Sequence, residues 1–381
     1  MWAMIFGLAL LCAGACFIYI SDRLARFPVF DRLTLGKRWR RMLLGVGLTV
    51  LLSLVLTLTL GYINTIICLI HLALFWLLCD GAAVLLARLS REKRHGKPHT
   101  VAGCVAIALT VSYLSVGWVL ANHVRQTDYR CTTQKAVGSL RVVQISDSHV
   151  GTTFDGDGFA AELERIEALK PDVVVVTGDF VDDDTAREDM LRSCEALGAL
   201  HTTYGVYFVF GNHDKGYYAS QRGYSGDDLI AALESNGVTV LQDESVLLGD
   251  RFYLIGRQDR SEENERGNGR ASMEQLLMPL DRSKYLIVLD HQPCDYDAQT
   301  AVGVDLVLSG HTHGGQLIPL DLLNPLLSEN DLVYGMERRE GTTFIVNSGI
   351  SDWAIKFKTG CKSEFVVIDI AENTESSVSG Q

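Results

Sequence analysis

Four long apolar runs within the first 125 residues limit what this chain can fold into. They cover residues 1–20, 42–63, 65–89 and 100–124, and the first two contain no charged side chain. Crossing the roughly 30 Å hydrocarbon core of a bilayer takes about 20 helical residues, so each run is long enough to span it. The sequence therefore predicts a transmembrane region of four spans over residues 1–124. The first run lacks the basic start of a signal peptide, and we expect it to be retained.

The connections between the runs predict how the spans are oriented. The loop at 21–41 carries seven Lys or Arg residues, the loop at 88–99 is also basic, and "YINT" at 62–65 has no charge. Basic loops stay in the cytoplasm. Four spans then place everything after residue 124 outside the cytoplasm, in a multi-pass protein of the cell membrane. An odd number of spans would reverse this orientation.

The third predicted span contains His71 and Asp80, with Arg88 near its end. Asp80 either makes a structural hydrogen bond within the helical bundle or has a functional role, since charges in spans are rare. His71 is expected to pack between helices. A transport function for the spans would rest on these two residues alone.

The charge of the chain is distributed unevenly. Through residue 125 there are thirteen basic and four acidic residues, whereas the remainder has 21 basic and 42 acidic ones. So acidic a region should repel nucleic acid, which we therefore do not expect as a partner, and could attract divalent cations. The nine cysteines form no CxxC motif, which argues against a zinc ribbon. Cys131, Cys194, Cys294 and Cys361 could pair in an oxidising space, with no connectivity predicted.

The remaining sequence predicts an α/β domain over residues 140–371, after a polar linker at 125–139 and before a disordered tail at 372–381. Apolar runs such as "DVVVVT" at 172–177 alternate with helical stretches near 157–169 and 185–200. Continuous β-branched runs indicate strands buried on both faces. Ligands of such sheets bind beyond the carboxyl ends of the strands. Polar clusters follow predicted strands five times, as "SDSHVG", "GDFVD", "GNHD", "DHQP" and "GHTHGGQ".

These clusters predict a metal centre. Imidazole, carboxylate and amide donors suit Mn, Fe or Zn, and they are too many for one tetrahedral ion. Two ions sharing a carboxylate could clamp the oxygens of phosphoryl transfer and lower the pKa of bound water to about 7. Gly178, Gly211 and Gly310 are expected to turn the chain sharply, and Gly314 and Gly315 to let the backbone approach an anion. The side chains are Asp147, His149, Asp179, Asn212, His213, His291, His311 and His313.

The five motifs in this order resemble the calcineurin-like metallophosphoesterase superfamily, and most of all its membrane-tethered bacterial branch, over residues 140–370. The resemblance implies a four-layer α-β-β-α sandwich. It implies that Asp179 bridges two ions. The first would be held by Asp147, His149, Asp179 and His313, and the second by Asp179, Asn212, His291 and His311.

The resemblance also implies two catalytic residues that are not ligands. His213 would stabilise or protonate the leaving oxygen, and Asp214 would orient His213. On an extended segment, side chains two residues apart share a face, so His311 and His313 could each reach a different ion.

Several further residues in or near the motifs also carry predictions. Asp182 contacts the metal ligands or caps a helix. The polar loop at 256–272 is either a lid or substrate loop, with Arg257 and Arg260 as candidate phosphate contacts, or a disordered surface loop. Asp290 points away from the site. Ser148 and Thr312 are structural spacers, and "NSG" at 347–349 could approach the site.

The sequence thus predicts a membrane-anchored phosphohydrolase that uses two divalent metal ions. Attack by a metal-bound hydroxide would hydrolyse a phosphomonoester or a phosphodiester, with a lipid-linked or cell-envelope phosphate as one option. The alternative is a metal-binding membrane sensor or scaffold without turnover. The oligomeric state is not predicted.

Overall fold

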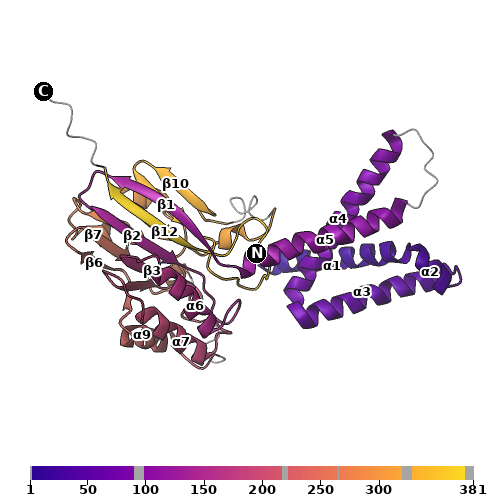
Figure 1. Cartoon of the computed structure of the whole chain (residues 1–381), viewed down its shortest axis with the longest axis horizontal. Helices are drawn as coiled ribbons and strands as arrows, with labels where there is room; N and C mark the ends of the chain where they lie inside the picture. Colours follow the sequence, from indigo (N-terminus) through magenta and orange to yellow (C-terminus); the bar gives the residue numbers. More distant parts are fainter. Residues whose placement is uncertain (1, 90–97, 217–221, 265, 320–327, 374–381) are drawn as a thin grey trace. The chain divides into compact units, whose positions relative to one another are not determined.

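The computed structural model describes residues 2–89, 98–216, 222–264, 266–319 and 328–373. The chain divides into two compact units (Figure 1). The helical unit comprises Met1–Trp118 together with Ala354–Lys356. The sheet unit comprises Val119–Trp353 together with Phe357–Gln381.

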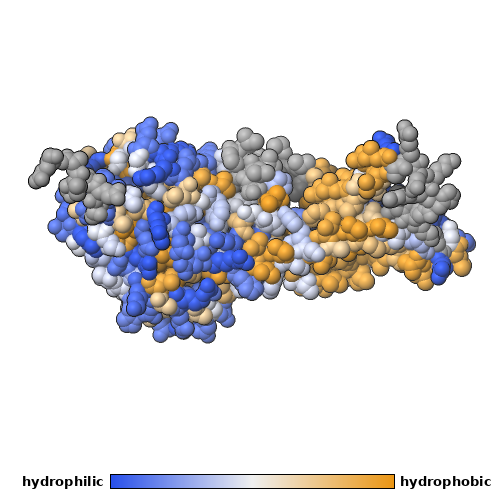
Figure 2. Space-filling view, turned by 45° about the horizontal axis from the view of Figure 1, so that its top comes forward, coloured by the Kyte–Doolittle hydropathy of each residue, from blue (hydrophilic) through white to orange (hydrophobic). Residues whose placement is uncertain are grey.

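The helical unit contains three helices that are long and apolar enough to cross a membrane, at 38–60, 62–89 and 100–122. Figure 2 shows the apolar surface that these helices expose. The first predicted span also forms a helix, but most side chains of its first ten residues lie outside the described ones. Four spans therefore stay a prediction. The helices are α1 (Trp2–Ala25), α2 (Pro28–Leu33), α3 (Arg38–Leu60), α4 (Tyr62–Leu89) and α5 (Pro98–Asn122).

Gly61 separates α3 from α4. Its φ of 85° and ψ of 166° are open to glycine because it has no Cβ. The prediction that residues 62–65 form the connection is wrong, since they make the first turn of α4. The basic connection at 90–97 lies outside the described residues.

Asp80 and His71 have structural partners inside the helical unit. The Tyr19 hydroxyl donates to Asp80 over 3.0 Å, and Arg23 Nε lies 2.8 Å from the same carboxylate. This supports the interpretation of Asp80 as a hydrogen-bonded residue of the bundle. His71 packs between α4 and α5 as predicted, with its ring 5.5 Å from that of Tyr113.

The sheet unit is built on two six-stranded sheets (Figure 1). The first sheet has the order β1 (Arg125–Thr133), β12 (Glu364–Glu372), β2 (Ser139–Ile145), β3 (Val173–Thr177), β4 (Val206–Val209), β5 (Thr239–Val240). In it, β2 to β5 run parallel, and β12 is antiparallel to β2 and parallel to β1. The second sheet has the order β10 (Gly335–Arg339), β11 (Thr342–Val346), β9 (Leu306–Ser309), β8 (Tyr285–Leu289), β7 (Phe252–Gly256), β6 (Glu244–Leu248). In it, β7, β8, β9 and β11 run parallel, with antiparallel β6 and β10 at the edges.

Strand β3 shows why a continuous apolar run is needed in the first sheet. Successive side chains of a strand point to opposite faces. Val173 and Val175 lie in the apolar cluster shared by the two sheets, whereas Val174 and Val176 lie in the cluster shared with helices. Those helices are α6 (Gly156–Glu167), α7 (Arg187–Gly198) and α9 (Gly226–Ser235). A third cluster joins the second sheet to α11 (Met273–Leu277) and α12 (Tyr296–Ala301).

The predicted linker at 125–139 is wrong for its first nine residues, which form β1 at the edge of the first sheet. Its sequence has no apolar alternation, and Cys131 is its one buried residue. Backbone pairing with β12, which the sequence cannot display, defines this strand. The predicted tail begins too early, since β12 extends to Glu372, and residues 374–381 lie outside the described ones. All nine cysteines are unpaired.

We predict that Leu254→Ala, in β7, lowers the free energy of unfolding by about 2–5 kcal/mol, because it removes a buried side chain between the two sheets. Leu254 is 0% exposed, whereas Leu247 in the neighbouring strand is 40% exposed. Denaturant unfolding of the two alanine variants measures the difference. A Leu247→Ala change as large as that of Leu254→Ala would contradict the assigned core.

Candidate metal centre

The carboxyl ends of strands from both sheets supply two clusters of potential metal ligands. In each cluster one ligand atom per residue lies within 4.8 Å of the others. Strands β2, β3, β8 and β9 lead into the loops that carry these residues. The first cluster is Asp147, His149 and His313, and the second is Asp179, His291 and His311.

The first cluster brings together two histidine rings and a carboxylate. The His149 and His313 rings stack with centroids 5.2 Å apart, and His313 Nε2 lies 3.6 Å from Asp147 Oδ1. His149 Nδ1 lies 3.4 Å from Asp182 Oδ2, which leaves its Nε2 as the ligand atom. This contact supports the first interpretation of Asp182. The second is wrong, because the residue that caps α7 is Ala186.

The second cluster has one histidine whose tautomer is fixed by a backbone group. His291 Nδ1 lies 2.8 Å from the Thr177 carbonyl oxygen, to which a neutral ring donates. Nε2 then carries the lone pair, and it lies 3.2 Å from Asp179 Oδ2. The His311 ring lies 5.1 Å from the His291 ring.

Asp179 lies between the clusters. Its Oδ2 is 3.2 Å from His291 Nε2 and 3.8 Å from His149 Nε2, a residue of the other cluster. Its Oδ1 accepts a hydrogen bond from the His213 backbone N–H over 2.9 Å. A carboxylate in this position can serve both clusters at once.

The unpaired atoms test whether these residues fit metal ions. Among the described residues, five buried ligand atoms have no hydrogen-bond partner. Leaving a buried polar group unpaired costs about 1–3 kcal/mol, so five such atoms around two clusters indicate a missing partner. Nitrogen and oxygen donors of this kind suit Mn, Fe or Zn. The atoms are His149 Nε2, Asn212 Oδ1, His291 Nε2, His311 Nδ1 and His313 Nδ1.

The electrostatics favour a neutral imidazole at His311 and His313 and an ionised carboxylate at Asp179. Burial lowers the pKa of His311 to about 4, and burial together with His149 lowers the pKa of His313. Burial opposes ionisation of Asp179, but the nearby histidines, His291 first, outweigh it and hold its pKa well below the usual range. Burial also opposes protonation of His291, yet Asp179 keeps the pKa of that ring raised.

The backbone of the site is left-handed at five of these residues. Positive φ is uncommon outside glycine and costs about 1–3 kcal/mol where the surroundings enforce it. The expectation of an extended segment at His311 and His313 is therefore wrong, although the two rings do join different clusters. The left-handed backbone at both histidines, rather than strand periodicity, sets the directions of the two rings. The φ values are 50° at Asp147, 36° at His149, 51° at Asp179, 71° at His311 and 47° at His313.

The glycines of the motifs provide space more than turns. Gly178 has a φ of 82°, as a sharp turn requires, but the φ angles of Gly211 and Gly310 are not left-handed. A Cβ at Gly211 would lie 2.2 Å from Asp179 Oδ1, and one at Gly310 would lie 2.4 Å from Asp147 Oδ2. At these two positions a side chain is excluded by the close packing of the loops against the carboxylates, and not by the backbone φ.

Asp214 shapes the loop that carries Asp179. Its buried carboxylate accepts hydrogen bonds from the backbone N–H groups of four residues, over 2.7–3.0 Å. Burial and the charge of Asp179 raise its pKa to about 7. The orientation of His213 by Asp214 stays a prediction. The four donors are Gly211, Asp179, Phe180 and Val181.

The predicted phosphate contacts have other partners. Arg257 is buried and lies 2.9 Å from Asp290 and 3.2 Å from Asp295, so its charge is already neutralised. The Asp290 carboxylate therefore faces Arg257, consistent with its predicted orientation away from the metal ligands. Arg260 pairs with Glu329 over 2.8 Å.

The "NSG" motif reaches the site, as one interpretation proposed. Ser146 Oγ contacts both Asp147 Oδ2 and Asn347 Oδ1, and the Ile350 N–H donates to the Ser146 carbonyl over 2.9 Å. Sequence reasoning missed Ser146, which directly precedes the first ligand.

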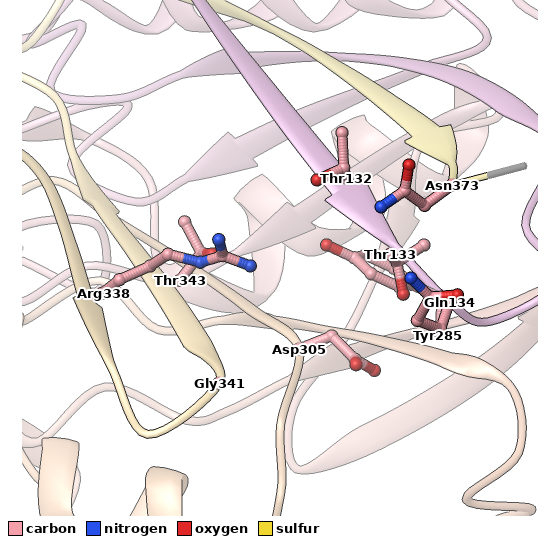
Figure 3. Close-up of a pocket in the computed structure, with 9 residues that line it drawn as sticks. All are labelled: Thr132, Thr133, Gln134, Tyr285, Asp305, Arg338, Gly341, Thr343 and Asn373. Carbon is pink, nitrogen blue, oxygen red and sulfur yellow. The ribbon is translucent and has the colours of Figure 1, made fainter. Parts of the chain in front are cut away.

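A surface pocket of about 330 Å³ lies elsewhere in the sheet unit (Figure 3). It is lined by Tyr285, Asp305 and Arg338, among others, and by none of the predicted metal ligands. Tyr285 begins β8, whereas His291 follows the other end of that strand. The pocket is therefore separate from the metal centre.

The comparisons with known proteins agree with this geometry. Residues 140–315 match the family model described as calcineurin-like phosphoesterase. The chain carries a calcineurin-like metallophosphoesterase domain. An uncharacterized metallophosphoesterase of Helicobacter pylori strain J99 is 30% identical over 239 residues, which cover 62% of this chain and 61% of that relative. The chain thus spans less than two thirds of that protein.

Two vertebrate proteins called transmembrane protein with metallophosphoesterase domain are also similar. The Bos taurus protein is 31% identical and covers 60% of this chain and 52% of its own length. The Danio rerio protein is 29% identical over 315 residues and covers 77% of this chain and 70% of its own length. That match extends beyond the metallophosphoesterase domain into the helical unit. A solved dimetal phosphatase from Danio rerio has a TM-score of 0.40 at 14% identity, covering 60% of this chain and 91% of its own, too low to carry an argument.

We predict that Gly211→Ala weakens metal binding by about 10–100-fold, because the added methyl group displaces the Asp179 carboxylate. Gly226→Ala is the control, since its Cβ would come no closer than 3.3 Å to another residue, at the Cγ of Lys215. Metal content after dialysis measures both. Equal metal content in the two variants would contradict the close packing at Asp179.

Proposed function

We propose that the protein is a membrane-anchored phosphohydrolase that depends on two divalent metal ions and cleaves a phosphomonoester or a phosphodiester. The observation that carries this proposal is the pair of buried histidine and carboxylate clusters with Asp179 between them. A sharing carboxylate suits two ions close together, the arrangement that clamps both oxygens of a phosphoryl transfer.

The ligands proposed for each ion follow the two clusters. Asp147, His149, Asp179 and His313 would hold one ion, and Asp179, Asn212, His291 and His311 the other. When bound, two such ions supply a nucleophilic water at neutral pH and neutralise charge on the phosphate. The unpaired Oδ1 of Asn212 supports its inclusion.

His213 is the residue proposed to move a proton. Its backbone N–H donates to Asp179, and its ring lies 5.2 Å from the His149 ring, so it borders both clusters without belonging to either. An imidazole in this position can protonate the leaving oxygen of the ester. Asp214 would act with it by holding the intervening loop.

The proposed architecture is a four-layer α-β-β-α domain after four membrane spans. Apolar clusters on both faces of each sheet support the layers, and three apolar helices and the names of the vertebrate relatives support the membrane anchor. The basic loops support an extracytoplasmic domain. An anchored enzyme meets lipid-linked or cell-envelope phosphates at high local concentration, so we favour these as substrates.

We predict that His213→Ala lowers kcat about 10²–10⁴-fold while two ions remain bound, because it removes only proton transfer. His201→Ala is the control, since His201 has a side chain 92% exposed and pairs with Glu167. Hydrolysis of an aryl phosphodiester and an aryl phosphomonoester by the full chain with Mn²⁺ measures both. Metal binding by the wild type without turnover of any phosphoester would instead favour a sensor or scaffold.

We predict that alkaline phosphatase fused to the C-terminus is active, because the C-terminus lies outside the cytoplasm. The physical reason is that the two basic loops between spans, at 21–41 and 88–99, stay in the cytoplasm, so that four spans place the C-terminus on the other side. Paired fusions of alkaline phosphatase and a fluorescent protein that matures only in the cytoplasm give opposite signals for the two orientations. A fluorescent, phosphatase-inactive pair would contradict the proposed location.

A further inference from the structure

Lys358 is a fully buried lysine whose ammonium group is bound by backbone carbonyls. It is 0% exposed, and its Nζ donates to the carbonyl oxygens of Ser348 over 2.7 Å, Ser351 over 3.0 Å and Gly349 over 3.3 Å. An ammonium group has three donors and no acceptor, so these three bonds use all of them. Burying a charge is unfavourable unless it is bound in this way, which makes the position specific for lysine.

The segment that Lys358 holds, residues 347–351, contacts the loop of Asp147. The Ser351 N–H donates to the Asp147 carbonyl over 3.3 Å, and the Ile350 N–H donates to the Ser146 carbonyl over 2.9 Å. Gly349 packs so closely that a Cβ there would lie 2.7 Å from the Asp147 Cβ. The conformation of Asp147 therefore depends on this segment.

The same segment contacts the loop of His313. A Cβ at Gly314 would lie 2.9 Å from the Ser348 Cβ and 2.8 Å from the Cys361 Cβ, and Cys361 Sγ donates to the His313 carbonyl over 3.1 Å. Segment 347–351 thus lies against the loops that carry two of the three residues of the first cluster. In the second cluster His291 has separate support from the Thr177 carbonyl.

We propose that Lys358 is a positioning residue that holds Asp147 and His313 in place for one of the two metal ions. The inference rests on the proposed dinuclear centre. Lys358 acts through the backbone of segment 347–351 and does not itself touch an ion or a substrate. Its loss should loosen the first cluster and spare the second.

Two substitutions separate the positive charge from the three-point binding. Lys358→Met keeps most of the volume but removes the donor to the Ser348 and Ser351 carbonyls, whereas the Gly349 carbonyl keeps the Glu364 N–H over 2.9 Å. Lys358→Arg keeps the charge, but a planar guanidinium cannot place three donors as an ammonium group does. Lys284→Met is the matched control, because Lys284 pairs with Asp250 and the Asp250 carbonyl at the surface.

The test is calorimetric titration of the metal-free full chain in detergent with Mn²⁺. We expect two ions in the wild type and in Lys284→Met. In Lys358→Met we expect one ion to bind with unchanged affinity and the other about 10–100-fold more weakly, the same pattern as in Asp147→Asn. Lys358→Arg should show a smaller loss at the same ion.

Unchanged binding of both ions in Lys358→Met, or equal loss of both, would overturn the positioning role. If Lys358→Met does not fold, Lys358→Arg decides by the same criterion. A wild type that binds no ion would instead refute the proposed function, so the two failures are distinguishable.

Discussion

The structure depends on one buried carboxylate, Asp179, being placed between imidazoles from loops that are far apart in the sequence. His149 and His291 approach it from different loops, and a backbone N–H from the third loop binds its other oxygen. A cluster of buried donors and acceptors is stable only when every member has a partner. His149 Nε2 and His291 Nε2, which face this carboxylate, have no hydrogen-bond partner. Metal ions bound at this position would supply the partner that these nitrogens lack.

The surrounding protein is arranged to hold these loops in conformations they would not adopt alone. Asp147 and Asp179 both have left-handed φ angles, each at some energetic cost. Asp214 offsets this for one loop by accepting four backbone hydrogen bonds, and Lys358 does so for another by donating three. The apolar strand β3 anchors the whole edge, because it is buried on both faces. The rigid strands and the hydrogen bonds of Asp214 and Lys358 thus together stabilise the strained loops that carry the metal ligands.

The sequence predicted the parts of this protein that are written in local patterns. The run "VVVVT" marks β3, and the order of the five motifs led to the histidines and carboxylates that the structure gathers into two clusters. The polar edge strand at Arg125–Thr133 could not be predicted, because pairing with β12 defines it and its side chains do not. The left-handed turns at His311 and His313 were missed because two alternate residues also fit a strand. Lys358 was missed because its role depends on three carbonyls that fold around it.

The central claim is that the protein holds two ions that share one carboxylate. Electron paramagnetic resonance of the full chain loaded with Mn²⁺ tests it most directly, since two ions joined by a common ligand are magnetically coupled and isolated ions are not. The account predicts two equivalents of Mn²⁺ per chain and a coupled spectrum that reverts to that of an isolated ion in Asp179→Asn. A single isolated Mn²⁺ signal at saturation in the wild type, or no binding at all, would contradict it.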